Sequence, residues 1–357
     1  MKRGGFDVII GNPPYVEYSK VRKEYTVKDI ECIEAGNLYT FVIARSFKLQ
    51  ESRSRIGMII QLSAFCTPRM ISFQDLWFKH VSLTHLSFFD DRPGKLFDGL
   101  EHIRVAIVIG QLGSVNSTVA TTKYVKFATS ERSILFDILS YQINENPRHN
   151  SSVLKVSTKE ENSIVKKLWI QPNTLQDYLQ DQENQNFVYY GYGYGYWGKI
   201  LNFKSYFKGD EITASTGDKY IYCRNKIDRD VIVAIMNSNL FYWFYTNYSD
   251  GHNFTKHVIG SLPFQYPIEQ NALILKALCA NLMLDLKQHA RRKSAFYKAT
   301  GQVEYEEYVQ RLSKPIIDEI DNVLAKHYGF TDEELDFIIN YDIKYRMGQN
   351  SGDDSEE

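Results

Sequence analysis

Apolar residues near the start of the chain form short unbroken runs, and each run ends at turn-forming residues. Residues 6–10 are followed by Gly11 and two prolines, and residues 55–62 are followed by a polar turn. Continuous apolar runs of this length predict buried strands of the parallel type. Between them, residues 37–49 carry apolar side chains at three- and four-residue spacing, which predicts an amphipathic helix. The pattern therefore predicts an α/β fold for this part of the chain.

Two more strands are predicted at residues 83–89 and 103–110, after which the character of the chain changes. The next part is polar and then rich in short aromatic runs separated by Gly and Asp. Residues 271–297 and 315–328 return to helical spacing, and residues 331–334 form a capping box for a last helix. We expect four parts: a partial sheet domain at 1–130, an α+β domain at 131–268, a helical segment at 269–348 and a disordered acidic tail at 349–357.

The composition is typical of a globular protein, with 43% hydrophobic and 24% charged residues in a chain of 357. There is no run of about 18 apolar residues and no signal peptide, so no membrane association is expected. The four cysteines lie far apart without a Cys-x-x-Cys pair, which predicts reduced thiols, no metal site and a cytoplasmic protein. Because the formal net charge is −1, nucleic-acid binding would have to use local basic faces, such as residues 20–23 or 291–293.

The turn after the first apolar run is unusually stiff. Pro13 and Pro14 each fix their own φ and exclude the preceding residue from the helical region. The side-chain amide of Asn12 and the carbonyl of Pro13 are therefore held in one arrangement, with Tyr15 beside them. Open α/β sheets bind ligands at the carboxyl ends of their strands, which makes this turn a candidate site. The alternative is an ordinary strand-ending turn.

The segment that ends in Asn12, Pro13, Pro14 and Tyr15 resembles the catalytic motif of adenine-specific DNA methyltransferases, as in type II restriction–modification methylases and methylase–endonuclease fusions. The resemblance implies a doubly wound sheet and a methyl transfer from S-adenosyl-L-methionine to the exocyclic amine of an adenine flipped out of double-stranded DNA. The Asn12 oxygen and the Pro13 carbonyl would accept the two N–H bonds of that amine. They would thereby draw its lone pair out of the ring and towards the methyl group.

The same resemblance implies roles for residues outside the motif. Tyr15 would stack on the flipped base, and Phe97, just before a predicted strand, would form the opposite wall. Asn37, Leu38 and Tyr39, in the first turn of the predicted helix, would border the cofactor pocket, and a plain amphipathic helix is the alternative for each. The aromatic-rich second part would recognise the target DNA sequence.

The resemblance begins in mid-domain. In the family, the Gly-rich loop and the acidic residue that bind the cofactor both precede the Asn-Pro-Pro-Tyr strand, and here only six residues precede Asp7. We therefore expect the carboxyl-terminal half of a methyltransferase sheet, inactive alone and in need of a complementing amino-terminal half. The edge left by missing strands would favour association.

Two other functions stay open at this stage. One is a non-catalytic DNA-specificity subunit, and the other is part of a methylase–restriction endonuclease fusion. The chain has no convincing P-D…(D/E)-x-K pattern of a nuclease, so DNA cleavage would have to come from another segment or an endonuclease partner.

Overall fold

A computed structural model describes residues 5–97, 99, 102–113, 117–209, 215, 217–298 and 301–348, and the expected tail at 349–357 lies outside this range. The chain divides into two compact units, residues 1–162 with 246–250, and residues 163–245 with 251–357. The expected boundary after residue 130 falls inside the first unit, where residues 131–162 include the last strand of its main sheet.

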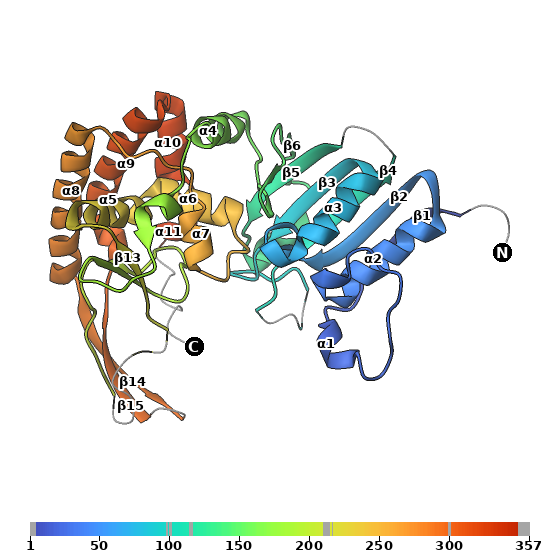
Figure 1. Ribbon diagram of the computed structural model, residues 1–357, viewed down its shortest axis with the longest axis horizontal. Coiled ribbons are helices and arrows are strands. Elements are labelled where there is room, and N and C mark those ends of the chain that lie inside the picture. Colours follow the sequence, from blue (N-terminus) through green and yellow to red (C-terminus); the bar gives the residue numbers. More distant parts are fainter. Residues whose placement is uncertain are drawn as a thin grey trace. The chain divides into compact units, whose positions relative to one another are not determined.

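The first unit is built on a six-stranded sheet with the order β1-β2-β4-β3-β5-β6 (Figure 1). β1 runs parallel to β2 and β3 parallel to β5, whereas β4 is antiparallel to both of its neighbours. The sheet is therefore mixed. The elements of this unit are β1 (Phe6–Gly11), α1 (Tyr18–Val21), α2 (Leu38–Leu49), β2 (Gln50–Gln61), α3 (Ile71–His80), β3 (Val81–Phe89), β4 (Val105–Leu112), β5 (Thr118–Val125), β6 (Gln142–Ile143), β7 (Arg148–His149) and β8 (Ser152–Val153).

The predicted helix and strands of this unit are confirmed. The helix predicted at 37–49 is α2, with Asn37 in an extended conformation as its N-cap. The strands predicted at 55–62, 83–89 and 103–110 correspond to β2, β3 and β4, and β2 begins earlier than expected, at Gln50.

Helices α2 and α3 lie on the same face of the sheet (Figure 1). Phe47 of α2 and Trp77 of α3 pack together in a buried cluster, with ring centroids 5.7 Å apart. The same cluster contains Met58 of β2, Val108 of β4 and Leu86 of β3, which share one face by strand register. This layer forms the main core of the first unit.

The expectation that the first strand is buried is wrong. Phe6, Val8 and Ile10 of β1 are 60%, 58% and 82% exposed. β1 is the edge strand, and these alternate residues point to the face opposite Ile9, which packs into the core. On that face the register leads from Ile10 through Gly57 to Ile109, which is itself 48% exposed. A doubly wound sheet has helices on both faces, and the described residues of this unit form a helical layer on one.

The second unit contains two small antiparallel sheets and a group of helices. Its sheets have the orders β11-β10-β13-β9 and β12-β15-β14. α4 (Lys159–Trp169) crosses the division between the units, and so does α6 (Asn239–Tyr248), whose last three residues belong to the first unit. The other elements are β9 (Leu179–Gln180), β10 (Phe187–Tyr190), β11 (Ile200–Leu201), β12 (Phe207–Gly209), β13 (Lys219–Cys223), α5 (Lys226–Asn237), α7 (Lys256–Gly260), α8 (Glu269–Gln288), β14 (Arg291–Tyr297), β15 (Gly301–Glu307), α9 (Lys314–Tyr328), α10 (Asp332–Asn340) and α11 (Ile343–Arg346).

One segment of the predicted carboxyl-terminal helical part has a different structure. Helical spacing predicts a helix through residue 297, but α8 ends at Gln288 and residues 291–297 form strand β14. β14 pairs along its whole length with β15, and this pairing, which spacing within one segment does not reveal, decides its structure. The predicted capping box is confirmed, because Thr331 Oγ1 accepts a hydrogen bond from the Glu334 backbone N–H at the start of α10.

Among the described residues, no helix combines the length and the apolar character that crossing a membrane requires. The four cysteines are all buried as free thiols.

Candidate active site

The polar residues of the first unit gather at one edge of its sheet. β1, β2, β3 and β5 run in the same direction, so their carboxyl ends share this edge. Asn12 follows β1, Gln61 ends β2, Asp90 follows β3 and Lys126 follows β5. Arg104 precedes the antiparallel β4 and therefore lies at the same edge. This is the edge at which α/β sheets hold their ligands.

The Asn12–Tyr15 turn follows the end of β1, as predicted. Asn12 and Pro14 are exposed, Pro13 is buried, and no described residue forms a hydrogen bond with the Asn12 side chain. Its amide is therefore open to a ligand, while the adjacent backbone is held by the buried ring of Pro13.

Tyr15 is partly buried against the core. Its ring meets Tyr39 edge to face, with centroids 6.1 Å apart, and contacts both apolar clusters of the first unit. Its hydroxyl is buried and has no hydrogen-bond partner among the described residues. Burial raises the pKa of Tyr15 to about 12, so the phenol is neutral near pH 7.

Asn37 joins the segment after the motif to the end of β2. Its Nδ2 donates to Glu17 Oε1 at 3.3 Å and to Gln61 Oε1 at 3.5 Å. The Asn37 side chain is buried, and its Oδ1 has no hydrogen-bond partner among the described residues. An acceptor left unpaired in a buried position costs free energy, unless a ligand supplies a donor. Asn37 therefore has one acceptor available at this edge.

The two neighbours of Asn37 differ in accessibility. Leu38 is partly exposed, whereas Tyr39 is completely buried and its hydroxyl contacts Met70 Sδ at 3.6 Å. Tyr39 is thus a core residue behind Tyr15, and a molecule at the start of α2 would meet Asn37 and Leu38.

Phe97 lies in the connection between β3 and β4 and is partly exposed. Its neighbour Leu96 packs on a small buried cluster that Tyr15 also contacts. The structure therefore brings the connection that carries Phe97 to the same edge as the Asn12–Tyr15 turn. This cluster consists of Phe89, Val105, Val125, Phe127 and Leu135.

A buried charged group at this edge was not identified from the sequence. Arg104 Nε lies 3.1 Å from Asp90 Oδ1, and its Nη2 lies 3.1 Å from Asp91 Oδ1. Arg104 Nε also donates to the Tyr124 hydroxyl at 2.7 Å. Burial holds the pKa of Asp90 above its ordinary value, against the opposing effect of the nearby cations. Adjacent acids directly after one predicted strand, with an arginine at the start of the next, are the sequence signal of this group.

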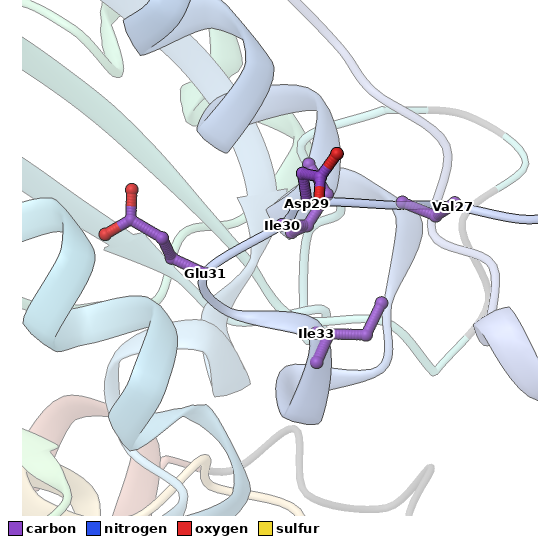
Figure 2. A pocket seen from close by; sticks show the side chains of 5 residues that line it. All are labelled: Val27, Asp29, Ile30, Glu31 and Ile33. Atoms are coloured by element: carbon purple, nitrogen blue, oxygen red, sulfur yellow. The ribbon is translucent and has the colours of Figure 1, made fainter.

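An open depression on the first unit lies away from the strand ends. It has a volume of about 430 Å³ and is lined by Val27, Asp29, Ile30, Glu31 and Ile33. Figure 2 shows the two carboxylates pointing apart, and Glu31 is paired with Lys79 at 3.0 Å. Since its polar groups do not converge, this depression is a weaker candidate than the edge of the sheet.

Comparisons with known proteins agree with this reading of the first unit. Residues 1–94 match the model of the Eco57I restriction-modification methylase family. A comparison with curated protein sequences gave no match. The matched region includes Asn12, Asn37, Gln61 and Asp90 of the candidate edge, whereas Phe97, Arg104 and Lys126 lie outside it.

Solved structures of restriction-modification enzymes are also similar. The type IIL restriction-modification enzyme MmeI in complex with DNA is 9% identical, with a TM-score of 0.51 over 95% of this chain and 57% of that chain. The type IIG restriction endonuclease BpuSI is 9% identical, with a TM-score of 0.33 over 94% of this chain and 54% of that chain. A nuclease-deletion mutant of the type ISP enzyme LlaGI with a DNA substrate mimic is 16% identical, with a TM-score of 0.33 over 52% of this chain and 20% of that chain.

The chain therefore spans little more than half of the MmeI chain and about a fifth of the LlaGI chain. The likeness to MmeI concerns the fold. The mixed α/β first unit contains a region that resembles a restriction-modification methylase, and the fold of the chain resembles that of MmeI.

Proposed function

We propose that this chain is part of a site-specific, adenine-specific DNA methyltransferase of a restriction–modification system. The observation that carries the proposal is the exposed amide of Asn12, held by two prolines at the carboxyl edge of a sheet whose region resembles such methylases. The proposed reaction transfers a methyl group to the exocyclic amine of an adenine in double-stranded DNA.

Asn12 and Pro13 would activate the amine. The Asn12 side-chain oxygen and the Pro13 backbone carbonyl would each accept one N–H of the amine. An amine held by two acceptors turns its lone pair out of conjugation with the purine ring, which makes it a better nucleophile. The prolines hold both acceptors before the base arrives, so little ordering is needed at the moment of reaction.

Two aromatic residues would hold the base. Tyr15 is fixed by its contact with Tyr39 and by the two clusters on which it packs. Phe97 belongs to a connection that reaches one of these clusters through Leu96. A flipped base stacked between two aromatic side chains gains roughly 1–3 kcal/mol from each.

The cofactor of this reaction would be S-adenosyl-L-methionine, which supplies the methyl group when it is bound. The unpaired Oδ1 of Asn37 fits a hydrogen-bond donor of such a molecule, and the partly exposed Leu38 fits an apolar contact. Both residues lie next to Gln61 at the end of β2. The buried Tyr39 would support Tyr15 and would not touch the cofactor.

The exposed edge strand supports the proposal of a complementing methyltransferase half. The outer backbone groups of β1 have no strand partner among the described residues, and Phe6, Val8 and Ile10 are exposed beside them. An added α/β segment could supply a parallel strand next to β1 and a helix over the exposed side chains. The strand would form hydrogen bonds with the outer backbone groups of β1, and the helix would cover the apolar side chains. We expect the isolated chain to bind the cofactor poorly, and calorimetry showing tight binding by it would overturn this expectation.

The test of the proposed function uses the chain together with a complementing methyltransferase half. We expect the assembly to form N6-methyladenine in duplex DNA, detected by mass spectrometry of the digested product. Asn12→Ala should reduce the rate at least a hundredfold while leaving duplex binding unchanged, because it removes one acceptor of the transition state. Gln270→Ala, at an exposed position on α8 outside the predicted recognition part, is the control that should keep full activity. Undiminished methylation by Asn12→Ala would refute the proposed mechanism, and a methylated cytosine as the product would refute adenine specificity.

A further inference from the structure

The β14–β15 hairpin of the second unit extends beyond the helices of that unit (Figure 1). It is braced along one side by the short strand β12, which pairs with β15, so that β14 is the outer strand. Val303 of β15 is 3% exposed and anchors the hairpin. At the far end of the pairing, Phe296 is 72% exposed and Tyr297 is 44% exposed.

The charges of the hairpin are divided between its strands. Arg291, Arg292, Lys293 and Lys298 belong to β14 and the residue after it, whereas the carboxylates belong to β15. Glycine, aromatic and small residues make up most of the remainder. The outer strand is therefore the basic one.

The carboxylates of β15 are engaged at the base of the hairpin. Glu307 Oε1 lies 2.7 Å from Lys293 Nζ, and Glu306 Oε1 lies 3.8 Å from Arg292 Nη2. Glu304 Oε2 accepts a hydrogen bond from the Tyr206 hydroxyl at 3.2 Å. The Arg292 guanidinium also lies 4.0 Å from the centre of the Tyr206 ring. Two of the four basic side chains are thereby neutralised within the hairpin.

The other two basic side chains of the hairpin are Arg291 and Lys298. They lie at the two ends of the outer strand. Both are exposed, and in the part of the chain that the structure describes neither has an acidic partner. The hairpin therefore presents an exposed aromatic pair, Phe296 and Tyr297, with an unpaired lysine directly after it and an unpaired arginine at its base.

We propose that this hairpin enters the major groove of the DNA duplex on which the proposed methyltransferase acts, an inference that rests on the proposed function. The major groove is about 12 Å wide and admits a two-stranded β-ribbon. Strands of seven residues reach roughly 24 Å, which is enough to follow the groove from its rim to its floor. Arg291 and Lys298 contact phosphates. Phe296, the more exposed of the two aromatic residues, makes apolar contacts with base edges such as the thymine methyl group, while Tyr297, whose side chain points to the other face of the strand, packs against the wall of the groove.

The hairpin contains residues 291–293, one of the two basic clusters that the sequence offers for nucleic-acid binding, but it lies outside the predicted recognition part. Residues 131–268 are the predicted recognition part, and the hairpin lies outside that range, in a segment expected to be helical. The hairpin adds a second DNA-contacting element, which affects affinity and target choice without taking part in methyl transfer.

Three variants of the full chain test the proposal by fluorescence anisotropy with a labelled 40-base-pair duplex of mixed sequence at several salt concentrations. Phe296→Ser with Tyr297→Ser should weaken binding about tenfold, because the apolar side-chain area that is buried against the groove is lost. Lys298→Gln should weaken binding and reduce the slope of log affinity against log salt by about 1, because one phosphate contact is lost. Leu284→Ser, at a 60% exposed apolar position on α8, is the matched control and should bind like the wild type.

The outcomes separate this proposal from the proposed function. Unchanged affinity and salt slope in both hairpin variants would overturn the hairpin proposal, even if Asn12→Ala abolishes methylation in the complemented assembly. If both hairpin variants bind DNA like the wild type but no longer retain an acidic protein partner, the hairpin is a protein interface and the hairpin proposal is overturned as well. A wild-type chain that binds no duplex would count against both. Circular dichroism and denaturation of each variant should match the wild type, since the altered side chains are exposed.

Discussion

The guanidinium of Arg104 lies 3.1 Å from the carboxylate of Asp90, and this ion pair joins the two ends of the connection that carries Phe97. Asp90 directly follows β3, and Arg104 directly precedes β4. The pair is largely buried, with 16% of the Arg104 side chain and 10% of the Asp90 side chain exposed. Phe97 therefore sits in a segment whose two ends are held together next to the Asn12–Tyr15 turn.

We expect Arg104→Met to destabilise the first unit by about 3–5 kcal/mol, because it removes the guanidinium that is paired with both buried carboxylates. Arg104→Lys should recover part of the loss, since a lysine supplies the charge but not the two separate donors. The measurement is the free energy of unfolding in urea. Arg45→Met, at an exposed position on α2, should change it by less than about 0.5 kcal/mol. Equal stability of the two Met variants would show that the ion pair has no structural role.

Tyr15→Phe should be neutral or stabilise the protein by up to about 1 kcal/mol, because it removes a buried hydroxyl that lacks a hydrogen bond. It should also retain methylation in the complemented assembly, since the ring that would stack on the base is kept. Tyr15→Ala removes the ring and should reduce both stability and methylation. A large loss of activity in Tyr15→Phe would instead give the hydroxyl a direct role in the reaction.

His149 predicts a local effect of pH on stability. Burial lowers the pKa of His149 from 6.5 to about 4, so the folded state excludes a proton that the unfolded state binds. The contribution of the neutral, buried His149 to the free energy of unfolding is therefore complete above about pH 6.5, and it is lost as the pH falls towards 4. Hydrogen exchange of residues 148–153, corrected for intrinsic rates, should show weaker protection at pH 5 than at pH 7.

The variant His149→Gln should show a smaller difference in protection between these pH values. His257→Gln, at an exposed position on α7, should leave the wild-type difference unchanged. If His149→Gln loses protection on acidification as the wild type does, another group causes the effect.

Ile10→Lys should reduce self-association of the isolated chain, because a charge on an exposed edge strand opposes pairing with another chain. Ile10 is 82% exposed, so the free energy of unfolding should change by less than about 0.5 kcal/mol. Sedimentation velocity measures the association. Ile9→Lys, on the side of β1 that packs into the core, should be strongly destabilising. In the complemented assembly, Ile10→Lys should weaken the binding of the other half, and unimpaired assembly would argue against β1 as its docking edge.

Local patterns predicted five elements of the first unit, namely β1, α2, β2, β3 and β4. The apolar runs indicated β2, β3 and β4, and the spacing in residues 37–49 indicated α2 with Asn37 at its start. Such patterns fail where the partner of a segment decides its structure. Residues 291–297 are a strand because β15 pairs with them, and β1 is exposed because no described strand lies beyond it.

The sequence by itself determined the stiff turn from Asn12 to Tyr15 and the strand before it, because the restrictions of proline and the strand preference of short apolar runs act on neighbouring residues. Only the tertiary structure decided that this turn shares an edge with Asn37 and with the ion pair of Arg104 and Asp90. These groups are separated by many residues in the chain, and the order of the strands brings them together.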